Sequence, residues 1–114
     1  MKKKRHVGAI ELVESGFALR DEPEGDAPPI GTWLWSSVVE VRAFKRDLVI
    51  VDLICLRFSM ADGSSVELNE EMVGFDALVA AMPAHLSGCP EFLQWWHPVA
   101  VPAFSPNERV LYVR

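Results

Sequence analysis

The most apolar stretch of the chain runs from residue 45 to residue 57 and reads KRDLVIVDLICLR. Apolar residues fill its centre, but Asp52 interrupts them and charged residues bound both ends. A membrane-spanning helix needs about 20 consecutive apolar residues, so this run is too short to be one. Because it is also rich in Val and Ile, which favour extended backbone, the pattern predicts a long β-strand.

A turn signal before this strand sets its expected pairing with the preceding one. Residues 46–47 are interpreted as a two-residue hairpin loop, which places Ala43 opposite Ile50 and Val41 opposite Asp52. After the strand, the pattern favours a different kind of loop.

Residues 61–63 predict a three-residue loop whose glycine adopts the left-handed conformation. This loop pairs Leu56 with Leu68 and Phe58 with Val66, so that all four share one apolar face. A two-residue loop would instead place the apolar residues of the last strand on the polar face, which is unfavourable.

The position of Asp52 among apolar residues needs an explanation, because an ionised carboxylate is costly to bury without partners. We expect either a hydrogen bond from the indole of Trp33 or Trp35, or from the hydroxyl of Ser36 or Ser37, or a β-bulge that turns the side chain outward. A structural role is favoured over a catalytic one.

The N-terminal part of the chain predicts two short strands and an exposed loop. Strands are expected over residues 7–13 and 17–19, and residues 21–31 hold three prolines, two glycines and four acids. Residues 33–44 alternate between apolar and other positions, which predicts one continuous strand leading into the long hairpin.

The period then changes from two residues to that of a helix. Phe75, Leu78, Val79 and Met82 fall at i, i+3, i+4 and i+7, the stripe of an amphipathic helix that has room to extend to Leu86.

The C-terminal segment predicts a short helix and a last strand. The helix is expected over residues 90–96 with Pro90 at its first position, and the strand over residues 110–113. Prolines at positions 98, 102 and 106 predict extended backbone between them.

The outward face of the long hairpin carries an apolar patch near the turn. In the predicted register this patch contains Phe44, Val49, Val51 and Leu53. Because a contiguous apolar patch is rarely left bare on a soluble protein, we expect it to be covered.

Two covers for the patch are considered. One is the aromatic C-terminal segment, with Phe92, Trp95, Trp96 and Phe104, and the other is a second copy of the chain in a twofold homodimer. Trp95 and Trp96 are adjacent, so only one can face the core and the other is expected to be half exposed. These two tryptophans and the four patch residues are the candidate binding residues.

Length and charge place the chain among ordinary globular proteins. A chain of 114 residues predicts a single domain, divided into a basic flexible tail (1–6), a sheet with a helix (7–86) and a C-terminal extension (87–114). The net charge of −5 argues against nucleic acid as a partner. The basic tail has no apolar segment behind it that would make a signal peptide, and contact with a lipid surface is not expected to be its main role.

The sequence contains no motif that identifies a catalytic, metal or cofactor site. It has no phosphate-binding glycine loop, no nucleophile elbow and no HExxH. Cys55 and Cys89 lack metal-ligand spacing and indicate reduced thiols in a cytoplasmic protein. The carboxylates of Glu67, Glu70 and Glu71 are better explained as a solvated strand end than as metal ligands.

The order of elements resembles the pleckstrin-homology-like superfamily, in particular its small bacterial members. The resemblance covers residues 7–86 and is carried by residues 16–19, 35–41, 62–68 and 75–82. It implies an α+β fold in which an antiparallel curved sheet or partial barrel is capped by a helix. It does not imply phosphoinositide binding, because the loop where such domains place basic residues is acidic here, over residues 20–26.

Three functions follow from these observations. The preferred one is a non-catalytic binding or protein-interaction module of unknown ligand, of which an immunity or adaptor protein for a specific partner would be one version. A small enzyme that uses an acidic residue in a pocket is the alternative.

Overall fold

The computed structural model describes residues 8–23, 26–48, 52–101 and 107–114. Its elements form two antiparallel sheets and two helices, with no closed barrel among the described residues. The three-stranded sheet contains β1 (Ala9–Val13), β2 (Gly16–Arg20) and β3 (Gly31–Leu34). The four-stranded sheet has the order β6 (Ser65–Asn69), β5 (Asp52–Met60), β4 (Val38–Asp47) and β7 (Glu108–Val113).

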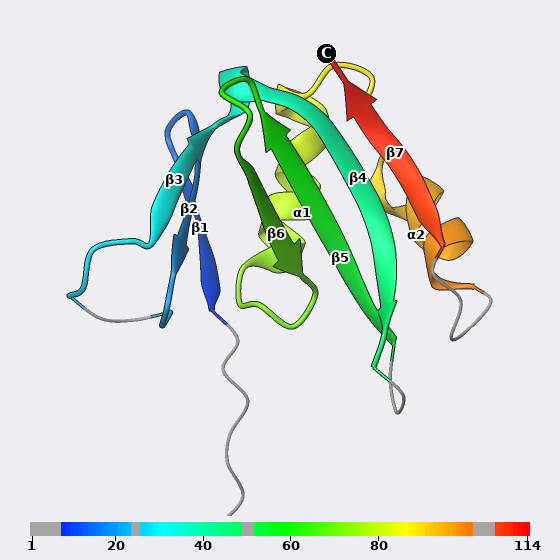
Figure 1. The fold of residues 1–114 in the computed structure, drawn as a ribbon, viewed down its shortest axis with the longest axis horizontal. Coiled ribbons are helices and arrows are strands. Elements are labelled where there is room, and N and C mark those ends of the chain that lie inside the picture. The colour runs from blue at the N-terminus through cyan, green and yellow to red at the C-terminus, as the bar shows by residue number, and fades with distance from the viewer. Residues whose placement is uncertain (1–7, 24–25, 49–51, 102–106) are drawn as a thin grey trace, which may run out of the picture.

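The helices α1 (Phe75–His85) and α2 (Phe92–Ala100) both lie behind the four-stranded sheet in the view of Figure 1. The expected α+β fold, a curved antiparallel sheet capped by a helix, is therefore confirmed. Among the described residues, neither helix has the length and apolar character required to cross a bilayer.

The continuous strand expected over residues 33–44 is wrong. A short 3₁₀ turn, η1 (Trp35–Ser37), separates β3 from β4 and moves the chain from one sheet to the other. The turn is fixed by hydrogen bonds from the Trp35 N–H to the Ser15 carbonyl at 3.0 Å and from the Ala61 N–H to the Ser37 carbonyl at 2.8 Å. Alternation on the two sides of such a turn resembles one strand, because each side has a period of two.

The three-residue loop between β5 and β6 is confirmed. Leu56 lies opposite Leu68 and Phe58 opposite Val66, and Gly63 has a φ of 89°. This is the left-handed region, which glycine enters without steric cost.

The two-residue loop expected at residues 46–47 is wrong. Both residues belong to β4, Asp47 lies opposite Asp52, and Ala43 lies opposite Leu56 instead of Ile50. The observed register moves Asp52 from the middle of the hairpin to its end, which avoids pairing a carboxylate with Val41. The partner of Ala43 moves from Ile50 to Leu56, an even number of residues along the strand. The faces are therefore unchanged, and Asp52 still shares one with Val41, Ala43 and Leu56.

The predicted helix over residues 75–82 and the predicted last strand are confirmed, as α1 and β7. The second helix begins and ends later than expected, at residues 92 and 100, and contains Pro98. Phe92, Trp95 and Val99 follow the helical period and face the core, so burial of this stripe offsets the hydrogen bond that Pro98 cannot donate.

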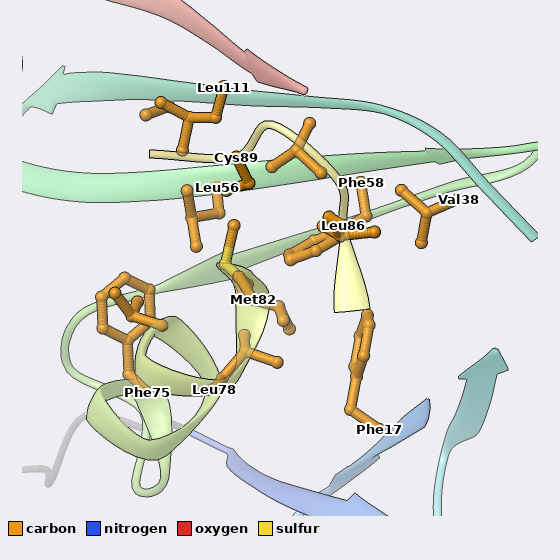
Figure 2. Close-up of a cluster of buried hydrophobic side chains, with 14 of the residues drawn as sticks. Phe17, Val38, Leu56, Phe58, Phe75, Leu78, Met82, Leu86, Cys89 and Leu111 are labelled. Carbon is orange, nitrogen blue, oxygen red and sulfur yellow. The ribbon is translucent and has the colours of Figure 1, made fainter. Parts of the chain in front are cut away.

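The core lies between α1 and the inward faces of the two sheets (Figure 2). Figure 2 shows Leu78 and Met82 of α1 directed toward Leu56 of the four-stranded sheet, and Phe17 extending from β2 toward the same cluster. The Phe17 ring lies 4.9 Å from that of Phe58, which belongs to β5. Phe17 thus joins the two sheets through aromatic contact.

Candidate functional site

Asp52 lies beside a buried lysine of the neighbouring strand. Lys45 Nζ is 3.3 Å from Asp52 Oδ2, and the side chains are 1% and 17% exposed. The expected partners in residues 33–37 are wrong, because those residues precede the first residue of β4 while Asp52 lies opposite its last. The β4–β5 pairing is regular at Asp52, so the expected bulge there is wrong as well.

Lys45 also connects the sheet to the second helix. Its ammonium donates a hydrogen bond of 2.7 Å to the carbonyl of Ala100, the last residue of α2. A cation is favourable at this end of a helix, where carbonyl groups are left without intrahelical partners. The Lys45–Asp52 pair therefore has a structural explanation in anchoring α2. Sequence reasoning missed Lys45, although it stands in phase with the inward residues Val41 and Ala43.

The outward face of the β4–β5 hairpin is covered in part by the chain's own charged side chains. The Phe44 ring has the Arg46 guanidinium 5.3 Å and the Arg57 guanidinium 5.0 Å from its centre. Arg46 donates two hydrogen bonds to Glu67, at 2.7 and 2.9 Å. Leu53 is buried on this face, while Val49 and Val51 lie outside the described residues.

Cys55 is also buried on this outward face. Burial raises the pKa of the Cys55 thiol to about 11, and it does the same for Cys89. Both groups are therefore neutral near pH 7 and are poor nucleophiles.

Helix α2 does not cover that outward face. Its buried residues Trp95 and Val99 belong to the core cluster on the inward side, together with Val41 and Leu56. The C-terminal segment from Phe92 to Trp96 is therefore not the cover that the sequence suggested. Phe104 lies outside the described residues.

The expectation that one of the two adjacent tryptophans faces the core and the other is partly exposed is confirmed. Trp95 is 1% exposed and Trp96 is 39% exposed. The Phe92 ring lies 5.0 Å from that of Trp95 and 6.3 Å from that of Trp96, so it packs between the core and the surface.

Helix α2 exposes a second apolar stripe beside the one it buries. Leu93 is 85% exposed, and Trp96 follows it at i+3 on the same side of the helix. A helix that packs one stripe into a core usually presents polar residues on its opposite face. Leu93 and Trp96 are therefore available for contact with another molecule.

Leu93 borders a groove between the two helices, with a volume of about 580 Å³. We call it the α1–α2 groove. Its described lining consists of Asp76, Val79, Ala80, Glu91, Phe92 and Leu93. The volume lies within the range of ligand-binding clefts, and a lining of four apolar residues and two carboxylates suits a ligand with an apolar anchor. The first turn of α2 is held by a hydrogen bond from the Glu91 N–H to Gln94 Oε1 at 2.9 Å.

Sequence reasoning did not identify the α1–α2 groove. The segment from Phe92 to Trp96 is apolar at four of five positions, so the pattern could not distinguish Leu93 from its buried neighbours. If the sequence had placed the start of the helix at Phe92, two residues later than expected, the helical period would have separated the buried stripe from the exposed one.

The carboxylates considered as metal ligands have other partners. Glu67 binds Arg46, and the Glu70 carboxylate accepts a hydrogen bond of 3.3 Å from the Ile54 N–H. Burial raises the pKa of Glu70, with smaller contributions from the negative charges of Glu71 and Asp76. No group of metal-ligating side chains occurs among the described residues.

No family model, curated protein or solved structure matches this chain. The resemblance to the pleckstrin-homology-like superfamily therefore stays a prediction.

Proposed function

We propose that this chain is a non-catalytic protein-interaction module and that its partner binds in the α1–α2 groove. The observation that carries this proposal is the exposure of Leu93, at 85%, beside a groove whose lining includes Ala80 and Phe92. Covering a leucine side chain fully contributes about 1.5–3 kcal/mol, enough to anchor a binding interface.

Trp96 extends this surface along α2. Tryptophan is enriched among the residues that dominate binding energy in protein interfaces, and this one has its ring partly exposed next to that of Phe92. In one recurring mode of recognition, an amphipathic helix of the partner lays its apolar face into an apolar groove.

A catalytic role draws less support from the described residues. Asp52 has a structural partner in Lys45, and both thiols are held neutral by burial. An immunity or adaptor protein for one specific partner is a version of the proposed function that the same groove would serve.

The proposal is tested by partner capture from cells that produce the protein, with Leu93→Asp compared to Leu34→Asp. Leu34 is an exposed leucine on β3, so the control introduces the same charge at a distant apolar site. We expect the wild type and Leu34→Asp to retain a common partner that Leu93→Asp loses, with all three proteins equally folded by circular dichroism. Retention of the same partner by Leu93→Asp would contradict the proposal.

A further inference from the structure

Among the described residues that line the α1–α2 groove, the charged ones are all acidic. Of the six described residues that line it, Asp76 and Glu91 carry negative charge and none carries positive charge. Asp76 is in the first turn of α1 and Glu91 immediately precedes α2, so the two carboxylates belong to the two walls of the groove.

Other carboxylates lie near the start of α1. The pKa of Glu70 is raised mainly by burial, and the negative charges of Glu71 and Asp76 add to the effect. Asp76, which lines the groove, therefore lies close enough to Glu70 to interact with it electrostatically. The carboxylates that a cation meets in the groove itself are those of Asp76 and Glu91, and their negative charge favours its association.

The apolar and acidic positions follow one helical face. Asp76, Val79 and Ala80 stand at i, i+3 and i+4 on α1, so a carboxylate precedes two apolar residues by about one turn. A helical ligand that contacts Ala80 and Leu93 and also faces Asp76 needs an apolar side chain and a cation about one helical turn apart. An amphipathic helix with leucine-like residues on one face and Lys or Arg beside them has this spacing.

We infer that the partner segment bound in the α1–α2 groove is a basic amphipathic helix. This inference rests on the proposed function and adds the chemistry of the partner. The apolar face of the helix contacts Phe92 and Leu93, and its Lys or Arg side chains face Asp76 and Glu91.

The two carboxylates also have an explanation within the chain, because acids stabilise helix N-termini. The two roles are separable by experiment. A purely stabilising role predicts that removing the charges lowers the free energy of unfolding and leaves ligand affinity unchanged. A binding role predicts that removing the charges lowers the affinity for a basic ligand.

The experiment uses two fluorescein-labelled synthetic peptides of equal length, each with leucine along one helical face. One carries lysine and the other glutamate at the polar positions, and binding to the full chain is followed by fluorescence anisotropy. We expect the lysine peptide to bind at least about tenfold more tightly, and its affinity to fall as salt rises, because ions screen exposed charges.

Variants of the protein then test whether the lysine peptide binds in the α1–α2 groove. Asp76→Asn with Glu91→Gln should weaken binding of the lysine peptide about two- to thirtyfold, the range expected when two exposed charge pairs are lost. The matched control, Glu14→Gln with Glu22→Gln, removes two exposed carboxylates elsewhere and should change affinity less than twofold. Leu93→Asp should remove apolar anchoring and weaken the peptide further.

Other outcomes have distinct meanings. Equal binding of both peptides, abolished by Leu93→Asp, would overturn the basic-helix inference and leave the groove as a binding site. Binding of neither peptide would overturn the basic-helix inference. If Leu93→Asp also captured partners as the wild type does, the proposed function would be overturned too. If the wild type is a dimer and Leu93→Asp is a monomer, the groove binds a second copy of the chain. If deletion of residues 2–5 makes the peptide bind more tightly, the groove is occupied by the chain's own basic segment. Either result would overturn the inference that an external basic helix binds there.

Discussion

Lys45 and Asp52 face each other across the end of the β4–β5 hairpin, with Nζ and Oδ2 3.3 Å apart and the lysine side chain 1% exposed. The lysine also reaches the Ala100 carbonyl at the end of α2. One buried cation thus connects the hairpin to the helix whose other end borders the α1–α2 groove.

Asp52→Asn should destabilise the protein, because it removes the negative charge next to a buried ammonium. We expect a loss of about 3 kcal/mol in the free energy of unfolding. This value is at the lower end of the range for breaking a buried ion pair, because Asp52 is partly exposed. Urea denaturation measures the change. The control Glu11→Gln breaks an exposed pair with Arg20 and should cost less than about 1 kcal/mol.

Replacing both members, as Lys45→Met with Asp52→Leu, should recover most of that loss, because the double variant buries no charge. If Asp52→Asn instead kept full stability and lost partner binding, Asp52 would have a functional role and not the structural one assigned above.

Gly63→Ala should lower the free energy of unfolding by about 1 kcal/mol, because alanine is strained at positive φ. A Cβ at this position would meet nothing within 4 Å, so the cost comes from the backbone alone. Gly63→Asn should cost less, since asparagine tolerates the left-handed region. Equal stability of Gly63→Ala and the wild type would show that the loop relaxes out of this conformation.

The two thiols should make stability depend on alkaline pH. Burial raises the pKa of Cys55 and of Cys89 from 9.0 to about 11 in the folded chain. Between these values the unfolded chain loses protons that the folded chain retains, so the free energy of unfolding falls as pH rises from 9 to 11.

Urea denaturation at pH 7, 9 and 10.5 measures this dependence. Lysine and tyrosine also titrate in this range, so the comparison is with Cys55→Ala and Cys89→Ala in one chain. The double variant should show a shallower decline than the wild type. Parallel declines in the two proteins would mean that the thiols ionise as readily when folded as when unfolded.

The extent to which the sequence predicted the fold depended on how many independent signals agreed. The loop at residues 61–63 was correct because the glycine and the apolar pattern on both strands demanded the same register. Arg46 and Asp47 were misassigned because charged residues suit a turn and an exposed strand end equally well. The inward lysine was missed because its burial depends on the Ala100 carbonyl, which comes from a distant part of the chain.

The candidate site was less predictable than the fold. Leu93 differs from Phe92 and Trp95 only in the direction it faces on α2, and that direction depends on how the helix packs against the sheet. On the outward hairpin patch that the sequence suggested, the Phe44 ring contacts the guanidinium groups of Arg46 and Arg57, and Val49 and Val51 lie outside the described residues. Sequence patterns report which residues are apolar, and tertiary packing decides which of them stay exposed.

The most direct test of the α1–α2 groove as the binding surface is an NMR titration of the labelled protein with the lysine peptide. We predict that the largest chemical-shift changes fall on the amides of Val79, Ala80 and Leu93 and on the indole N–H of Trp96. Changes centred on Phe44 and Leu53, on the outward face of the β4–β5 hairpin, would contradict the assignment of the binding surface to the groove.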